Sequence, residues 1–184
     1  NVKTNATISD DQIVGILSVI NPNYKNTDKS LNTTVESSSS DYMTASGYKT
    51  NRTGLSLGTG FEQYEDLFVN MDVSFYYEKL ETSTNASATK KKQEGDYIEN
   101  LFKYSITLNK LDQNFQPTDG YKTSFIQILP IYSDDLSIVN TFNASRYHSV
   151  TDNLILSGKL FFKAVNSIDD DVRVSRRVYI PSSK

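Results

Sequence analysis

Cysteine is absent from this 184-residue chain, and histidine occurs once, as His148. These absences exclude disulfides, thiolate metal sites, cysteine nucleophiles and a histidine-based metal cluster within the chain. No run of about 18 apolar residues occurs, so the sequence predicts no transmembrane helix. The N-terminal residues 1–10 lack the long apolar core of a signal peptide.

The residues that are abundant are those of strands and turns. Asparagine, serine and threonine are frequent, and there are 12 tyrosines and 9 phenylalanines, whereas alanine, a strong helix former, is scarce. The hydrophobic content of 37% is low for a globular domain. The net charge of -3 argues against nucleic acid as a partner, because binding to phosphates requires a basic face.

Apolar and polar residues alternate over long stretches. In LFVNMDVSFYYEK, one face carries Val69, Met71, Val73, Phe75 and Tyr77, and the other carries Asn70, Asp72, Ser74, Tyr76 and Glu78. The next such stretch sets Phe102, Tyr104, Ile106 and Leu108 against Lys103, Ser105, Thr107 and Asn109. Alternation with a period of two predicts β-strands with one apolar face, and we expect the apolar faces of these two strands to coincide.

Turn signals divide the chain into nine predicted strands. Their ranges are 1–10, 12–22, 28–41, 47–63, 67–80, 97–112, 121–133, 136–149 and 153–165. None of the links is long enough to require a helical crossover, so the fold class is all-β, an antiparallel up-and-down meander without a helix longer than about two turns. The polar link 81–96 is expected to be poorly ordered and to tolerate insertions.

Two architectures use one-sided strands. A soluble sandwich buries the apolar face against a second sheet, whereas a transmembrane β-barrel turns that face toward lipid and lines its interior with polar residues. The predicted strand lengths of about 9–16 residues are long enough to cross a bilayer. Aromatic residues lie near predicted strand ends, as in an interfacial girdle: Tyr64, Phe68, Tyr97, Phe115, Tyr121, Tyr132 and Tyr147. The pattern favours the barrel, and the soluble sandwich remains the alternative.

Three motifs resemble the outer-membrane protein assembly factor family, the BamA-type barrels. NKLDQNFQPTDGYKTSF (109–125) resembles a hairpin of that family, SVINPNY (18–24) a strand end, and RRVYIPSSK (176–184) the start of a long loop directed into the barrel lumen. The resemblance implies that residues 1–184 are one barrel domain or barrel fragment, from the middle of a family barrel, with the start of the lumen loop at 164–184. It assigns Pro117, Thr118, Asp119 and Gly120 to a periplasmic turn. Proline sets φ there, and Asp119 and Gly120 tolerate left-handed conformations.

The resemblance also implies a function. The chain would belong to the bacterial outer membrane, with the lipid bilayer, other assembly components and client outer-membrane proteins as its partners. It would help to fold and insert those clients without covalent catalysis and without a cofactor or metal. A soluble all-β binding or adhesion module is the alternative, and an outer-membrane enzyme barrel is a weaker third hypothesis.

Several other residues have simpler interpretations than a functional site. His148 is read as a surface residue at a strand end, and Asp169, Asp170 and Asp171 lack the spacing and glycine of a calcium loop. The basic clusters 90–92 and 173–177 are read as solvated loops. Gly58 and Gly60 suggest either a close approach of neighbouring groups or a simple weakening of the strand.

Closure of the sheet is the least determined feature. An antiparallel meander with an odd number of strands sets its first and last strands in the same direction, which is rare in such barrels. Residues 1–10 carry few large apolar side chains and would be the first to leave the ladder, whereas 171–180 has the β-branched residues of a tenth strand. We therefore expect a closed barrel of about eight strands, within a range of about 8–10. The alternatives are self-association through open sheet edges and a place within a larger assembly.

Overall fold

The computed structural model describes residues 1–134, 136–151, 153–168 and 171–178. These residues form one sheet of nine strands in the order in which they occur along the chain. The strands are β1 (Val2–Ile8), β2 (Gln12–Asn21), β3 (Ser30–Tyr42), β4 (Tyr48–Tyr64), β5 (Leu67–Thr82), β6 (Gly95–Leu111), β7 (Gly120–Ser133), β8 (Ser137–Thr151) and β9 (Leu154–Ser167). Each pairs antiparallel with the next. All nine predicted strands and the meander are confirmed.

The helical elements of the described chain are short. They are η1 (Tyr24–Asn26), α1 (Met43–Ser46), α2 (Ala88–Lys91) and η2 (Val174–Arg176). None of the helices in the described ranges is long and apolar enough to cross a membrane, a finding that does not bear on β-barrels. The predicted limit of about two helical turns is confirmed for these residues.

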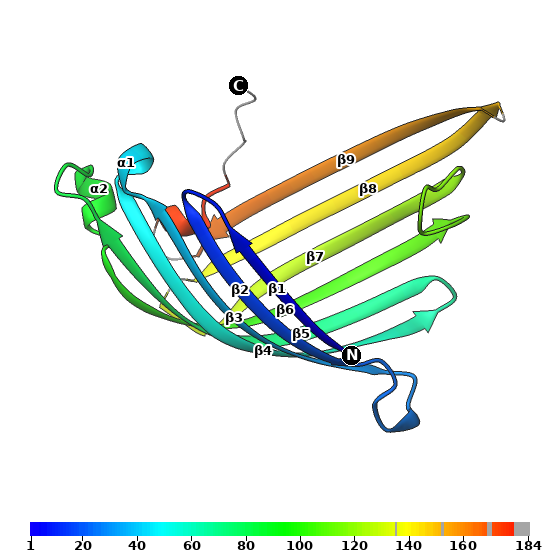
Figure 1. The fold of residues 1–184 in the computed structure, drawn as a ribbon, viewed down its shortest axis with the longest axis horizontal. Coiled ribbons are helices and arrows are strands. Elements are labelled where there is room, and N and C mark those ends of the chain that lie inside the picture. Colours follow the sequence, from blue (N-terminus) through cyan, green and yellow to red (C-terminus); the bar gives the residue numbers. More distant parts are fainter. Residues whose placement is uncertain (135, 152, 169–170, 179–184) are drawn as a thin grey trace.

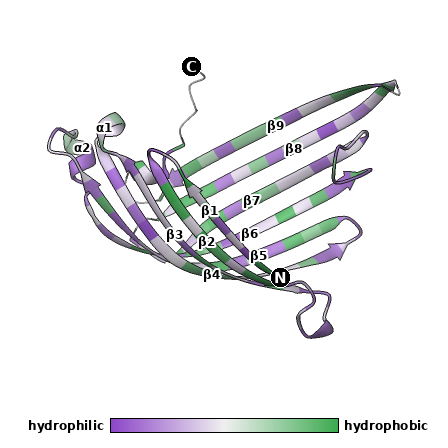
Figure 2. Cartoon of the chain, viewed as in Figure 1, coloured by the Kyte–Doolittle hydropathy of each residue, from purple (hydrophilic) through white to green (hydrophobic). Residues whose placement is uncertain are grey.

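The sheet is bent into an open trough (Figure 1). Across β5 and β6, Met71 lies opposite Tyr104 and Val73 opposite Phe102, while Asp72 lies opposite Lys103. Because directly paired residues share a face, the apolar residues of both strands occupy one side, as predicted. This is the convex face, and its side chains are exposed, among them Leu55, Leu57, Val73, Phe75, Leu160 and Phe162. Figure 2 shows the resulting alternation along the strands.

The other side, the concave face, is mainly polar. It carries Asn70, Asp72, Ser74, Tyr76 and Glu78 from β5, and their pairing partners on β4 and β6. The side chains that are most deeply buried lie on this face, and they include charged residues as well as leucines. A sheet that exposes its apolar face and buries polar groups inside its curve is the inverse of a soluble sandwich, and it is the arrangement of a membrane barrel wall.

The nine strands lie within the predicted range of about 8–10, but the described sheet differs from the favoured closed barrel of eight strands. Residues Val2–Ile8 stay in the ladder as β1, paired with β2, and within the described residues β1 and β9 do not pair with each other. The segment 171–178 is not a tenth strand either, because it forms the 3-10 turn η2 and leaves the sheet. Among the described residues, the pairing runs without a break from β1 to β9.

The two ends of the sheet differ. One end, the helix end, carries α1, α2 and the segment after β9, and the other, the turn end, carries residues 112–119 between β6 and β7. Tyr64, Tyr121 and Tyr132 face the convex side near strand ends and are 69%, 42% and 74% exposed, as a girdle requires.

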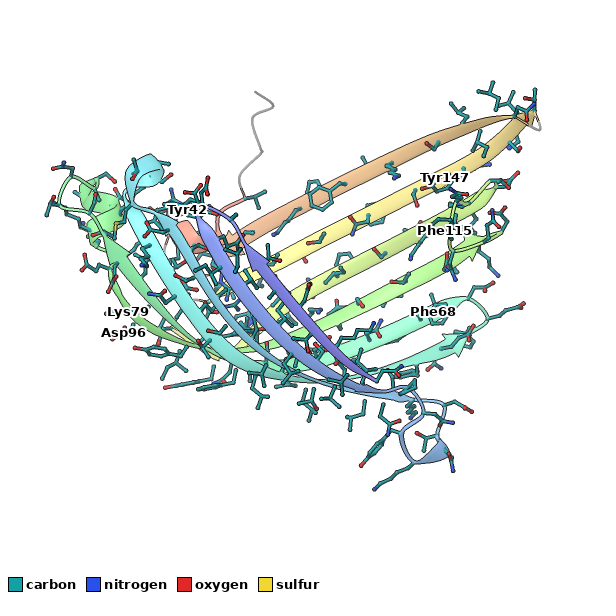
Figure 3. All side chains as sticks on the ribbon, viewed as in Figure 1. Tyr42, Phe68, Lys79, Asp96, Phe115 and Tyr147 are labelled. Carbon is teal, nitrogen blue, oxygen red and sulfur yellow. The ribbon has the colours of Figure 1, made fainter. Side chains whose placement is uncertain are left out.

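Three of the predicted girdle residues lie elsewhere. Phe68, Tyr97 and Tyr147 occupy concave positions, so the girdle prediction was wrong for them. Phe115 lies in the loop between β6 and β7, and it is labelled with Phe68 and Tyr147 near the turn end in Figure 3.

Candidate functional site

The concave face gathers charged and aromatic residues near the helix end. The register places Arg52 of β4, Glu78 of β5 and Tyr97 of β6 in one row across the sheet. Tyr76 and Glu99 form the adjacent row, beside Gly54. These strands are central and long, so their concave side chains are held on a rigid surface.

A segment from beyond β9 docks on these rows. Residues 171–178, here called the docked segment, lie inside the curve of the sheet (Figure 1). The Nη2 of Arg173 donates to Oε1 of Glu99 at 2.5 Å, and Nε of Arg176 donates to the same oxygen at 3.1 Å. The Nη2 of Arg176 and that of Arg52, the latter at 3.3 Å, donate to Oε2. One carboxylate with no exposed surface thus accepts from three guanidinium groups.

Further contacts orient the arginines. The Nη1 of Arg173 lies 3.7 Å from Oε1 of Glu78, and its guanidinium lies 3.8 Å from the centre of the Tyr97 ring. The guanidinium of Arg52 lies 3.5 Å from the centre of the Tyr76 ring. Stacking on an aromatic face stabilises a guanidinium most where water is excluded, and Arg173 is only 3% exposed.

An apolar contact completes the docking. Val174 is 1% exposed and packs with Tyr48 and Leu80, flanked by Tyr42 and Tyr97. Burying a valine side chain in this way contributes about 1.5–3 kcal/mol. The backbone N–H of Val174 donates to Oε1 of Gln93 at 2.9 Å, so the link between β5 and β6 also holds the segment.

That link is structured, contrary to the expectation for residues 81–96. It contains α2, whose Ser87 hydroxyl accepts from the N–H of Lys90. Lys90 Nζ donates to the carbonyl of Ser46 at 2.5 Å, and the hydroxyl of Tyr97 donates to the carbonyl of Gln93 at 2.6 Å. A polar sequence alone did not predict the contact of Lys90 with Ser46, because these residues are 44 positions apart in the chain.

The site is suited to holding a chain segment. Buried charges are tolerated when they are paired and hydrogen-bonded, and removal of one partner is strongly destabilising. Arginine suits this task because its planar group offers several donors to a carboxylate. Within the described ranges no group of three or more His, Cys, Asp or Glu residues could hold a metal ion.

The turn predicted at residues 117–120 lies between β6 and β7. Asp112 anchors it, accepting from the N–H of Thr118 at 3.1 Å and from its hydroxyl at 2.6 Å. The Thr118 hydroxyl lowers the pKa of Asp112, and the N–H groups of Asp119 and Thr118 add to the effect. Gly120 is left-handed with φ of 98°, and Gln116, just before the turn, is left-handed with φ of 51°.

The remaining candidates stay on the surface or outside the described residues. Nδ1 of His148 lies 3.5 Å from Oδ2 of Asp119, and both side chains are more than half exposed. Asp169 and Asp170 lie outside the described residues. At Gly58, an added Cβ would overlap the carboxylate of Asp72, which supports the close-approach interpretation of this glycine.

Sequence reasoning missed the docking site. The sequence predicts a solvated loop around Arg173 and Arg176, and this prediction is wrong for Arg173, which is buried. One signal was present, since Glu78 and Glu99 fall at concave positions of adjacent strands, where two carboxylates need cationic partners. The start of the loop was expected at 164, whereas β9 continues to Ser167.

Comparisons with known proteins agree with this geometry. The model of the Omp85 superfamily domain matches residues 1–183. The solved structure described as BamA from Haemophilus ducreyi lacking POTRA domains 1–3 matches with a TM-score of 0.81 and 17% identity, covering 91% of this chain. At that identity the likeness shows the fold. The chain spans 36% of the length of that structure. No curated protein matches the sequence.

Proposed function

This chain belongs to the Omp85 superfamily, and we propose that it forms part of the wall of a bacterial barrel that folds and inserts other outer-membrane proteins. Membership of the family places the chain in the outer membrane. The observation that carries the proposal is the inverted sheet, which in its described strands is mainly apolar outside and mainly polar inside. A soluble adhesion module would not expose so many large apolar side chains on one face.

In this proposal the convex face contacts lipid and the concave face borders an aqueous lumen. The turn at 117–120 faces the periplasm, which sets the helix end and the docked segment on the outer side of the membrane. The long link between β5 and β6 lies at this outer end, in agreement with the longer extracellular loops of such barrels. The partners are the bilayer, other assembly components and client proteins, and the work on clients involves no covalent step.

The arginine–carboxylate cluster has a positioning role. It holds residues 171–178 against β4, β5 and β6, and thereby fixes this part of the lumen loop on the lumen wall. A loop that is anchored in this way can support the barrel interior. It leaves the edges of the sheet accessible, where a client strand would pair.

Reconstitution tests the proposal. The full-length protein that contains this chain is placed in lipid vesicles, and a urea-denatured client barrel is added. Conversion of the client to a protease-resistant form is then followed over time. We expect faster conversion than in empty vesicles, a reduced rate for Glu99→Gln and an unchanged rate for Glu81→Gln, since Glu81 forms an exposed pair with Lys79. A rate equal to that of empty vesicles would contradict the proposal.

A further inference from the structure

Carboxylates are unevenly distributed over the concave face. The concave positions of β3 to β6 include five acidic residues: Glu36, Glu62, Asp72, Glu78 and Glu99. The described residues of β7, β8 and β9 contain neither aspartate nor glutamate. Their concave positions instead carry Lys122, Lys159 and Lys163, here called the cationic wall.

Two of these lysines frame a hollow. Lys122 of β7 and Lys159 of β9 both lie opposite Ser145 of β8, so their backbones are about 10 Å apart across two strand spacings. The hollow between them has a volume of about 370 Å³, and its lining includes Asn143, Tyr147 and Phe161. Two flexible ammonium groups can converge on one anion there, with hydrogen-bonding groups beside them.

The ammonium groups of the cationic wall are available. Within the described ranges no ion pair involves these three lysines, whereas Lys103, on the same face, lies 3.5 Å from Asp72. Phe161 occupies a concave position between Lys159 and Lys163, and it is 65% exposed. A large apolar ring that is left exposed between two cations suits a ligand with both carboxylates and an apolar side chain.

We propose that the cationic wall binds an acidic stretch of polypeptide, with a carboxylate between Lys122 and Lys159 and an apolar side chain against Phe161. In an extended segment, carboxylates at alternate residues lie about 6.6–6.8 Å apart and point the same way, which matches a row of lysines on flexible stems. The net charge of -3 disfavours nucleic acid, because binding to phosphates requires a basic face. The proposal rests on the proposed function in one respect, since it takes the concave face to be aqueous.

Fluorescence anisotropy with the full-length protein in detergent micelles tests the site. The probe is a short fluorescein-labelled peptide in which glutamate alternates with serine around one central phenylalanine. We expect binding that weakens as salt is added. The double variant Lys122→Ser/Lys159→Ser should bind about tenfold more weakly, and Phe161→Ser should also weaken binding. The double variant with arginine at both positions should retain binding, which shows that loss does not come from misfolding.

Matched controls sharpen the result. Lys103→Ser removes a lysine that is already paired and should leave binding unchanged, and a peptide with glutamine in place of glutamate should not bind. Equal binding by the wild type and the serine double variant would overturn the proposal, and so would displacement of the peptide by inorganic phosphate alone at matched ionic strength. A protein that accelerates client insertion but does not bind the peptide would refute this site alone. Binding without insertion would refute the proposed function alone.

Discussion

Replacing Glu99 by glutamine should release the docked segment. Glutamine keeps the shape of the side chain but removes the charge that three guanidinium groups share. Breaking a buried ion pair from one side costs about 3–5 kcal/mol. The side chains of Arg52 and Arg176 are 25% and 16% exposed and can regain water, which favours the lower value. A cost of about 3 kcal/mol raises the undocked population about a hundredfold.

Thiol labelling measures that population. The chain has no cysteine, so Val174→Cys introduces a single thiol into it at a position that is 1% exposed in the docked state. When docking is faster than modification, the rate of labelling by a maleimide follows the open population. We expect slow labelling of Val174→Cys in the full-length protein and labelling about a hundredfold faster when Glu99→Gln is added.

A matched variant tests whether burial matters. Glu81→Gln breaks an exposed pair with Lys79 at 2.7 Å, for which the expected cost is only about 0–1 kcal/mol. Its labelling rate should stay close to that of Val174→Cys alone. If Glu99→Gln and Glu81→Gln label at the same rate, the cluster does not hold the segment, and the reasoning from burial fails.

Two further predictions concern the sheet and the turn. Gly54→Ala should destabilise the protein by about 1–3 kcal/mol in urea unfolding, because the new Cβ would overlap the ring of Tyr76. At Gly158 an added Cβ meets nothing within 4 Å, so Gly158→Ala should be neutral. Equal effects of the two substitutions would contradict this prediction. Asp112 has a lowered pKa in the folded state, so its contribution to stability is present above the unfolded value of about 3.9 and is lost as pH falls through the folded value. An NMR titration should show its midpoint below 3.9 and a return toward that value in Thr118→Val, and an unshifted midpoint in the wild type would refute the assignment.

The strands could be predicted from the sequence because each carries its own signal. Alternation over β5 and β6 is local, and it set both the period and the shared face before any pairing was known. Turn residues bounded each strand within a few positions. The motif PTDG was informative because Asp112 and Thr118 lie close enough in sequence to bond each other across one turn.

The docking site and the extent of pairing could not be predicted in the same way. Glu99 and Arg173 are separated by most of β6, all of β7 to β9 and their links, so no local pattern joins them. Edge behaviour was misjudged because the few apolar side chains of residues 1–10 suggested weak pairing. β1 is nevertheless held by backbone hydrogen bonds to β2, which depend little on side-chain size. The fold-defining signals are local, and the site depends on contacts between distant segments.

The central claim is that the convex face meets lipid and the concave face meets water, and spin-label accessibility along β5 tests it most directly. Single cysteines at positions 69–77 of the full-length protein in bilayers are labelled, and collisions with oxygen and with a water-soluble nickel complex are measured. Oxygen concentrates in the hydrocarbon region and the nickel complex is confined to water. We predict high oxygen accessibility at Val69, Met71, Val73 and Phe75 and preference for nickel at Asn70, Asp72 and Tyr76, with a period of two. Nickel accessibility at every position, or an alternation of the opposite phase, would contradict the account.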